Sequence, residues 1–431
     1  MDSSLAAIRR FIPRPVFRAA NPAYHWMLAL ASACWYRFPS RHIKVIAVTG
    51  TKGKSSTVEI LGAILEEAGY RVALTDTIRF KIGSRSEPNL YKMSMPGRGF
   101  MQRFLRRAVN AGCDYAVLEM TSQGAVAYRH LWIDFDAFVF TNLSPEHIES
   151  HGSYERYVEA KLSIARRLGA SSKKGRALIV NADDKESGRF MSCAADRKMR
   201  YSLKDAEPYE IKDAGLSFSL GGATAVSPLS GTINLYNILA AAAAARSQGV
   251  SDGVIRKAVA AFGDIPGRVQ KIDAGQDFEV VVDYAHTPDS LKKFYEVFAG
   301  KRTICVLGGT GGGRDSWKRA EMGRIADACC ADIILTDEDP YDEDPEEIVA
   351  GVAAGISSKE PTVIMDRRAA IREAVRRART GEAVLITGKG TDPYIMGPKG
   401  SKTPWSDARV AREEVEALLA AKGLRPSAGR E

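Results

Sequence analysis

A strand–turn–helix segment at residues 46–57, with the sequence IAVTGTKGKSST, constrains this chain more than any other part of it. An apolar run, Val45–Val48, enters a glycine-containing turn, and a helical stretch follows at Val58–Glu67. A glycine turn between a strand and a helix that carries Lys54 and Ser55 is the layout of a phosphate-binding loop. The segment therefore predicts a nucleotide site at the end of a strand in an α/β fold.

The loop is expected to bind phosphate through its backbone N–H groups and the side chain of Lys54. Backbone N–H groups and the helix N-terminus face the phosphates. Lys54 is expected to reach the β- and γ-phosphates, and Ser55 or Ser56 is expected to bind Mg²⁺. The spacing departs from the general pattern, which has a glycine where this chain has Val48. The predicted nucleotide-contacting residues of the loop are Gly50, Thr51, Lys52, Gly53, Lys54, Ser55 and Ser56.

Strands and helices alternate along most of the chain, and this alternation predicts the fold class. The chain has 431 residues, more than one ordinary domain holds. The alternation favours parallel-rich sheets with helices on both faces. We expect a short helical segment over 1–43, a central ATP-binding α/β domain over 44–265 and a Rossmann-like α/β domain over 266–431.

The predicted strands are short apolar runs, and many of them end in Gly, Asp or Thr. In open α/β sheets ligands bind at the carboxyl ends of the strands, so these ends are the candidate sites. The runs are Val45–Val48, Ala116–Leu118, Ala137–Phe140, Ala177–Val180, Phe278–Val282, Thr303–Leu307, Ile333–Thr336, Thr362–Met365 and Ala383–Thr387. The predicted helices are Gly99–Ala111, Tyr154–Leu168 and Asn234–Arg246, and residues 200–229 form a small β-rich excursion.

The apolar, aromatic segment Tyr24–Tyr36 allows two interpretations. It is shorter than the ~20 residues that a membrane span needs, and no signal-peptide cleavage pattern accompanies it. One interpretation is a helix packed on the next domain. The other is an interfacial anchor, in which residues 20–38 contact a membrane surface and the preceding arginines face its headgroups.

The charge composition of the chain indicates which classes of ligand and partner it binds. The chain has 61 basic and 52 acidic residues, a net charge of +9, and no block of like charge that indicates a nucleic-acid arm. We therefore expect small-molecule substrates, no nucleic acid, and a monomeric enzyme. The six cysteines have no CxxC spacing, which is typical of reduced cytoplasmic proteins.

Three polar groups follow predicted strands of the first series. Glu119 ends one strand, where an acid beside a phosphate loop is a natural Mg²⁺ ligand. The stretch TNLSPEH places His147 after the next strand, where it either binds a metal or phosphate or simply caps a helix. Lys161 lies inside the following helix, where a lone lysine is usually solvated.

Together the segments GTKGKSS, LEMTS, TNLSPEHIESHG and YVEAK resemble the Mur ligase superfamily, and the resemblance runs from about Val45 to Glu416. Members of that superfamily share this shortened form of the phosphate loop, Gly-Thr-x-Gly-Lys. The segments NLYN (234–237), GR (267–268), DYAHTP (283–288), GRD (313–315), GKG (388–390) and WSD (405–407) extend it. The DYAHTP segment is specific to the MurE branch, the UDP-N-acetylmuramyl-tripeptide synthetases.

The resemblance implies an ATP-dependent amide ligase of peptidoglycan synthesis that forms an acyl-phosphate, which an amine then attacks. The first step brings two anions together, so cations must neutralise them. By analogy Ser55 and Glu119 hold one Mg²⁺, and His147 with a carbamylated Lys161 holds a second; Lys54, His147 and Lys161 are the implied catalytic residues. Further nucleotide contacts fall on Asn142, Asn237, Arg268 and Asp283.

Substrate contacts also carry over by analogy. Thr121 and Arg129 match positions that contact the muramyl peptide, and Arg129 suits a phosphate or carboxylate. Gln123 replaces a family histidine, and Glu146 replaces an aspartate. The implied amino-acid contacts are Arg314, Asp339, Tyr341, Gly388 and Asp392. The glycine-rich stretch 308–313 lacks the GxGxxG spacing of a dinucleotide site.

Two departures from the family pattern matter. About 43 residues precede the loop, too few for the family's N-terminal UDP-binding domain, so we expect the acceptor's uridine to be held elsewhere or to be absent. The second departure is Tyr341, which stands where diaminopimelate enzymes have an arginine, within the acidic segment DEDPYDED (337–344). By charge, an acidic pocket favours an ammonium side chain, so lysine or ornithine is expected over diaminopimelate.

Two other functions stay open at this point. A folylpolyglutamate synthetase shares the superfamily core and also lacks the UDP domain, although DYAHTP and the GKG and WSD segments argue against it. A regulator that binds ATP without ligation is the second alternative. The presence of Lys54, Glu119, His147 and Lys161 together argues against a loss of catalysis.

Overall fold

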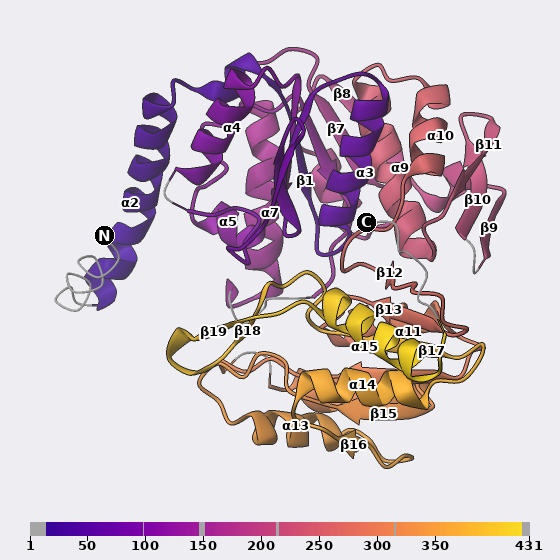
Figure 1. The fold of residues 1–431 in the computed structure, drawn as a ribbon. Coiled ribbons are helices and arrows are strands. Elements are labelled where there is room, and N and C mark those ends of the chain that lie inside the picture. The colour runs from indigo at the N-terminus through magenta and orange to yellow at the C-terminus, as the bar shows by residue number, and fades with distance from the viewer. Residues whose placement is uncertain (1–13, 98, 146–150, 213–214, 314–315, 425–431) are drawn as a thin grey trace. The chain divides into compact units, whose positions relative to one another are not determined.

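A computed structural model describes residues 14–97, 99–145, 151–212, 215–313 and 316–424 of the chain (Figure 1). The chain divides into two compact units, Met1–Phe262 and Gly263–Glu431. Each unit has its own sheet and its own buried core. The α/β class with parallel-rich sheets, predicted from the sequence, is confirmed.

The first unit is built on an 8-stranded sheet in the order β4-β3-β2-β5-β1-β6-β7-β8. Strands β2, β5, β1, β6, β7 and β8 run parallel, and the β3–β4 hairpin adds antiparallel strands at one edge. The strands are β1 (Lys44–Thr49), β2 (Val72–Thr75), β3 (Arg79–Ile82), β4 (Arg85–Pro88), β5 (Tyr115–Met120), β6 (Ala137–Phe140), β7 (Ala177–Asn181) and β8 (Arg197–Tyr201). Because β1 pairs with β5 on one side and β6 on the other, the loops after these three strands meet at one edge of the sheet.

Helices cover both faces of this sheet (Figure 1). One face packs on α4 (Phe100–Asn110), α5 (Ser122–Val126) and α7 (Tyr154–Gly169), whose apolar sides join the main core. The other carries α3 (Lys54–Glu67), which packs against α9 (Thr232–Ser247) and α10 (Asp252–Ala261). Short α8 (Ser187–Met191) lies between β7 and β8 in sequence. The β-rich excursion forms a separate 3-stranded antiparallel sheet of β9 (Tyr209–Lys212), β10 (Gly215–Leu220) and β11 (Ala223–Ser227).

Helix α9 is buried on nearly all sides. Its central residues Ala240–Ala245 are all buried, and so are Asn234 and Asn237 in its first turns. Alanine has the smallest side chain compatible with a strong helix preference, so it lets neighbouring elements approach closely. This close packing brings the start of α9 up to the start of α3.

The N-terminal helix α2 (Arg14–Trp35) contacts α4 in the same unit. The indole of Trp26 packs edge-on against Trp132, with ring centroids 5.7 Å apart. The side chains of Tyr24, Met27 and Trp35 are exposed. No helix in the described part of the chain is long and apolar enough to cross a membrane.

The second unit is a 6-stranded sheet in the order β12-β13-β17-β14-β15-β16, parallel except for β12. Helices α14 and α15 pack on one face and α11, α12 and α13 on the other. The strands are β12 (Gln270–Lys271), β13 (Glu279–Val282), β14 (Thr303–Leu307), β15 (Asp332–Leu335), β16 (Thr362–Val363) and β17 (Ala383–Ile386), and a β18–β19 hairpin (Tyr394–Met396, Lys402–Pro404) follows. The helices are α11 (Pro288–Glu296), α12 (Lys318–Cys329), α13 (Pro345–Ala353), α14 (Arg367–Arg377) and α15 (Asp407–Ala421).

Candidate functional site

The phosphate loop joins β1 to α3 and is closely packed on both sides. A Cβ atom on Gly50 would lie 1.9 Å from the hydroxyl oxygen of Thr141. Gly53 has a φ of +78°, and a Cβ atom there would lie 2.1 Å from the side-chain oxygen of Asn237. Only glycine fits at both positions, because a side chain would collide with a neighbour and, at Gly53, would also strain the backbone.

The loop after β6 braces the phosphate loop from one side. The Lys52 backbone N–H donates to Asn142 Oδ1 at 2.9 Å, and Asn142 Nδ2 donates back to the Lys52 carbonyl at 3.0 Å. The Thr141 hydroxyl donates to the same carbonyl at 2.7 Å. Asn142, predicted as a nucleotide contact, thus uses both polar atoms of its side chain to shape the loop backbone.

Lys54, at the first position of α3, folds back over the loop. Its Nζ donates to the Thr51 carbonyl at 2.8 Å and lies 4.0 Å from Glu119 Oε1. The side chain is partly exposed while Glu119 is buried. A lysine held beside its own loop in this way has the reach and the charge to meet phosphate oxygens above the loop.

Oxygen atoms gather where β5 ends beside α3. Ser55 Oγ donates to Glu119 Oε2 at 2.7 Å and lies 2.7 Å from the hydroxyl of Thr77. The Thr77 backbone N–H donates to the same Glu119 oxygen at 3.2 Å. Hydroxyl and carboxylate oxygens in this arrangement fit a hard cation such as Mg²⁺.

The described residues contain no group of three or more His, Cys, Asp or Glu side chains that would hold a metal unaided. Mg²⁺ normally keeps waters and phosphate oxygens among its ligands and takes only one or two groups from the protein. The Ser55–Glu119 pair is therefore a sufficient protein contribution to a nucleotide-bound Mg²⁺.

Lys161 lies at the same loop although it comes from α7. Its side chain is only 2% exposed, so the usual expectation of a solvated helical lysine is wrong here. Its Nζ donates to the Gly50 carbonyl at 2.6 Å and lies 4.8 Å from the ring centre of Tyr157. The Tyr157 hydroxyl in turn lies 2.9 Å from the hydroxyl of Thr51, so α7 contacts the loop through two side chains.

A buried carboxyl group that the sequence did not single out lies beside this cluster. Asp76 follows β2, and its Oδ1 accepts hydrogen bonds from the backbone N–H groups of Ile78 and Arg79. Burial, followed by the negative charges of Glu59 and Glu119, raises the pKa of Asp76 well above its ordinary value. The preceding strand, β2, is short and has no distinctive sequence pattern. Asp76 lies beside the end of β5 because β2 and β5 are neighbours in the sheet.

Of the predicted acceptor contacts, Thr121 and Arg129 lie close to one another along α5 and the turn that follows. Thr121 Oγ1 accepts from the Gly124 N–H at 3.1 Å and caps α5. Arg129 donates to the Met95 carbonyl, and burial lowers the pKa of its guanidinium. His151, which sequence reasoning passed over, lies with Nε2 3.0 Å from the hydroxyl of Ser122.

In the second unit, Arg268 and Asp283 fix one loop. The guanidinium of Arg268 lies over the ring of Tyr284, 4.5 Å from its centre. Asp283 accepts hydrogen bonds from the backbone N–H groups of Val269 and Ala285, each at 2.7 Å. A Cβ atom on Gly390 would lie 2.7 Å from Cβ of Tyr284, so the GKG turn packs directly on this loop.

Two carboxylates of the acidic segment around Tyr341 form ion pairs within the unit. Lys389, fully buried, donates to Asp339 Oδ1 at 2.7 Å and lies 3.6 Å from Asp392. Arg319 pairs with Glu343 at 2.6 Å. Two of the carboxylates in this segment, those of Asp339 and Glu343, thus meet buried or partly buried cations, and the preference for an ammonium side chain stays a prediction.

Gly388 and Glu338 lie against each other in the same region. A Cβ atom on Gly388 would lie 2.2 Å from Glu338 Oε2, and the other Glu338 oxygen accepts from the Thr310 hydroxyl at 2.9 Å. Burial raises the pKa of Glu338. The predicted residues His147, Glu146 and Arg314 lie outside the described residues.

The WSD segment has a structural explanation. Asp407 accepts two hydrogen bonds from the guanidinium of Arg367, both at 2.8 Å, and one from Trp405 Nε1, also at 2.8 Å. Ser406 caps α15 by accepting from the Arg409 N–H. The segment thus ties α15 to α14 through a buried ion pair.

Comparison with known proteins gives a consistent result for both units. The chain matches the Mur ligase middle domain over residues 48–245 and the Mur ligase glutamate ligase domain over residues 267–390. A UDP-N-acetylmuramoyl-L-alanyl-D-glutamate--2,6-diaminopimelate ligase from Syntrophomonas wolfei is 35% identical over 401 residues, covering 90% of this chain and 81% of the relative.

Solved structures agree with this match. A UDP-N-acetylmuramoyl-L-alanyl-D-glutamate--2,6-diaminopimelate ligase shares 30% identity and superposes with a TM-score of 0.59 over 87% of this chain and 79% of its own. Folylpolyglutamate synthase from Mycobacterium tuberculosis, complexed with ADP, has a TM-score of 0.70 over 85% of this chain and 92% of its own. Its identity is only 16%, so that likeness shows the fold alone.

Proposed function

The chain belongs to the Mur ligase family, and from that premise we propose that it joins a diamino acid to a muramyl-dipeptide acceptor at the expense of ATP, in peptidoglycan precursor synthesis. Its membership of this family makes the protein an acid–amino-acid ligase. The observation that carries the proposal is the contact of Lys161 with the Gly50 carbonyl, because it joins the family's helix lysine to the phosphate loop.

Nucleotide binding is assigned to the loop and its braces. The backbone of residues 50–56 would face the phosphates, and Lys54 would neutralise β- and γ-phosphate oxygens. Asn142 and Asn237 would act by holding the loop in shape, which their contacts with Lys52 and Gly53 support. In the second unit, Arg268 and Asp283 are assigned to the nucleotide by resemblance.

Ser55 and Glu119 would hold Mg²⁺, since their oxygens lie together and buried at the end of β5. When bound, the ion supplies positive charge at the phosphoryl group, where two anions must approach. The chain's own contribution is a pair of oxygen ligands that Thr77 contacts from the turn after β2.

Lys161 is proposed to be carbamylated in the active enzyme and to hold a second Mg²⁺ with His147. A carbamate converts the ammonium into a carboxylate-like oxygen ligand, which suits a hard cation. The carbamate nitrogen keeps one hydrogen, so it can still donate to the Gly50 carbonyl. The burial of the Lys161 side chain against the phosphate loop supports the proposal, because it places the modified group at the site.

Thr121 and Arg129 are proposed to contact the acceptor. Among the described residues, Arg129 has no carboxylate partner, and its hydrogen bonds go to Met93 and Met95. A partly buried guanidinium without a carboxylate partner among the described residues suits an anionic group of the acceptor. Both residues lie in the unit that carries the phosphate loop.

The amino acid is proposed to be bound by the region of Asp339, Tyr341, Gly388, Asp392 and Arg314. Relatives named for diaminopimelate and the pairing of Asp339 with Lys389 weaken the charge argument for lysine. We therefore propose a diamino acid, with lysine, ornithine and meso-diaminopimelate as the candidates to be compared.

The test is an ADP-release screen that crosses acceptors with free amino acids. A UDP-linked muramyl dipeptide, the same dipeptide without UDP and a folate would each be offered with lysine, ornithine, meso-diaminopimelate and glutamate. The proposal expects release only with a muramyl acceptor and a diamino acid. Release with folate and glutamate would establish the folylpolyglutamate alternative, and ATP binding without any release would establish the regulator.

The cellular setting is also a proposal. ATP use and six cysteines that form no disulfide support a cytoplasmic location. We propose that the enzyme acts as a monomer. Contact of residues 20–38 with a membrane surface stays a prediction, supported by the exposed Tyr24, Met27 and Trp35 of α2 and tested by co-sedimentation with anionic vesicles.

A further inference from the structure

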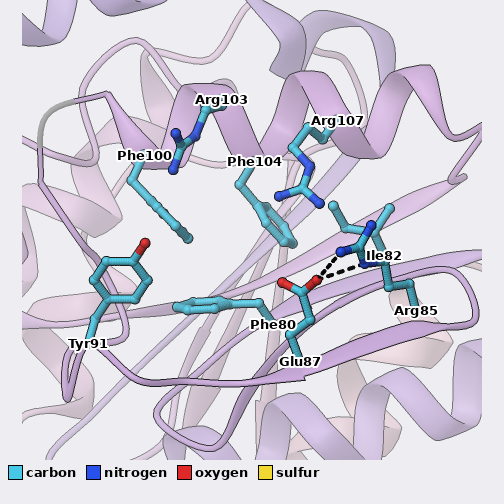
Figure 2. A pocket seen from close by; sticks show the side chains of 9 residues that line it. All are labelled: Phe80, Ile82, Arg85, Glu87, Tyr91, Phe100, Arg103, Phe104 and Arg107. Atoms are coloured by element: carbon cyan, nitrogen blue, oxygen red, sulfur yellow. Dashed lines mark hydrogen bonds and ion pairs between the residues drawn. The ribbon is translucent and has the colours of Figure 1, made fainter.

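A cavity of about 90 Å³ opens between the β3–β4 hairpin and α4 (Figure 2). Three of the rings that line it contact one another. The centroid of Phe80 lies 4.9 Å from that of Phe100 and 5.9 Å from that of Tyr91, and Tyr91 lies 5.5 Å from Phe100. Tyr91 is 51% exposed, so an aromatic face is open to solvent at the mouth.

Arginines form the rim of this cavity. Arg85 is paired with Glu87 at 2.5 Å, which leaves Arg103 and Arg107 as the rim charges with no carboxylate partner among the described residues (Figure 2). The guanidinium of Arg103 lies 5.5 Å from the ring centre of Phe100. Arg103 and Arg107 are four residues apart on α4, where like charges repel one another unless an anion lies between them.

Open aromatic rings beside two uncompensated guanidinium groups match a particular class of ligand. Rings of this kind stack on a nucleobase, and arginine binds phosphate oxygens in a bidentate manner. A lone phosphate would leave the rings unused, and an apolar ligand would leave the arginines unpaired. A nucleoside diphosphate uses both.

The cavity is joined to the predicted acceptor residues by one short loop. Tyr91 precedes Met93 and Met95, whose sulfur and carbonyl oxygen contact the guanidinium of Arg129. Met95 Sδ also accepts from the Thr121 backbone N–H at 3.2 Å. A ligand seated in the cavity therefore lies along the same loop as the residues assigned to the acceptor's peptide.

We propose that this cavity, lined by Phe80, Tyr91 and Phe100 and rimmed by Arg103 and Arg107, binds the nucleoside diphosphate end of the acceptor. The base stacks among the rings, and the diphosphate lies on the two arginines. The identification of the ligand as the acceptor's own UDP rests on the proposed function. The cavity itself is assigned from its rings and charges.

Binding of UDP to the full chain tests the proposal without turnover. Calorimetric titration with UDP would be run with the phosphate loop saturated by a non-hydrolysable ATP analogue, so that UDP cannot bind there. We expect UDP to bind, and the double variant Arg103→Gln/Arg107→Gln to lose at least about tenfold in affinity. Tyr91→Ala should lose several-fold, and Tyr91→Phe should bind as the parent does.

The matched control is Arg200→Gln, which removes one exposed arginine from β8 at the opposite edge of the same sheet. It should leave UDP affinity unchanged. Equal UDP affinity in the parent and the double variant, or no UDP binding at all, would overturn the proposal. Inorganic pyrophosphate binding as tightly as UDP would also overturn it, because the rings would then contribute nothing.

Turnover separates this proposal from the proposed function. In a ligating enzyme the double variant should raise KM for the UDP-linked acceptor about tenfold or more with kcat within about twofold, since binding is lost equally in ground and transition states. An acceptor without UDP should show no such change. Tight UDP binding by a chain that releases no ADP would leave the cavity in place and refute the ligase instead.

Discussion

Lys161 Nζ donates a hydrogen bond of 2.6 Å to the carbonyl oxygen of Gly50, so a lysine in the middle of α7 reaches the first residue of the phosphate loop. The two residues are 111 positions apart in sequence. The contact depends on β1 and β6 being neighbours in the sheet, because α7 follows β6 and the loop follows β1. It gives a buried lysine a place in the site that its sequence surroundings do not indicate.

Replacing Lys161 should stop ligation without unfolding the protein. We expect Lys161→Ala to lower kcat at least about 100-fold, the scale seen when one preorganised charge-stabilising group is lost. If the carbamate is the active form, added acetate should restore part of the activity by supplying a carboxylate in the space left by the side chain. ADP release with and without acetate measures this.

The control for Lys161 lies on the same helix. Within the described part of the chain, Ser163 donates only to the carbonyl of Ala160, so Ser163→Ala should keep the parent's kcat. Undiminished ligation by Lys161→Ala would refute a catalytic role for the lysine, and lost activity that no small carboxylate restores would argue against the carbamate.

Gly53→Ala should damage nucleotide binding through a specific collision. Its Cβ would lie 2.1 Å from Asn237, and its φ of +78° would add roughly 1–2 kcal/mol of backbone strain. Gly69→Ala at the other end of α3 has a φ of +88° but no atom within 4 Å of the new Cβ. Both variants should lose stability, and only Gly53→Ala should lose ATP affinity, by at least about tenfold in a titration.

The stability of the first unit should fall in mild acid because of His130. Burial, together with the charge of Arg167, lowers the pKa of this imidazole to about 4 from its ordinary 6.5. The folded state therefore keeps His130 neutral while the unfolded state takes up a proton below pH 6.5. Stability is complete above that pH and is lost between pH 6.5 and 4, by about 3 kcal/mol in total.

Denaturation midpoints across pH 4–7 check this titration. The parent should show a slope that His130→Gln reduces, since glutamine does not take up a proton in either state. A slope that is the same in both proteins would assign the acid sensitivity to other groups.

The buried pair Arg367–Asp407 should matter far more to stability than an exposed pair on the same helix. Asp407→Asn leaves the buried Arg367 guanidinium without its hydrogen-bonded counter-charge, which costs about 3–5 kcal/mol. Glu413→Gln removes a partly exposed carboxylate that pairs with Arg409 and Arg368, and it should cost about 1 kcal/mol or less. Urea unfolding followed through Trp405 fluorescence measures both, and equal losses would contradict the burial argument.

The sequence best predicted the buried strands whose carboxyl ends carry residues of the site. The strands β1, β5, β6 and β7 were predicted because a strand buried on both faces reads as an apolar run. Their carboxyl ends correctly located Glu119 and the phosphate loop at one edge of the sheet. The short hairpin β3–β4 was missed, since polar edge strands of four residues carry no such pattern.

Other features depend on pairings that no local pattern contains. Lys389 pairs with Asp339 across 50 residues, and so a segment that looks wholly acidic in sequence contains a compensated carboxylate in the fold. Asp76 and Thr77 come beside Glu119 only through the order of β2 and β5. Asn142 was predicted as a ligand contact, whereas its side chain holds the backbone of Lys52.

The packing of Asn237 against Gly53 has a consequence for how the protein is made. During synthesis the phosphate loop leaves the ribosome well before α9, which begins at Thr232. Until α9 docks through its alanines, one wall of the loop is absent. A nascent chain that stops short of Ser247 should therefore hold the motif and yet bind no nucleotide, so ATP binding can serve as a reporter for completion of the first unit.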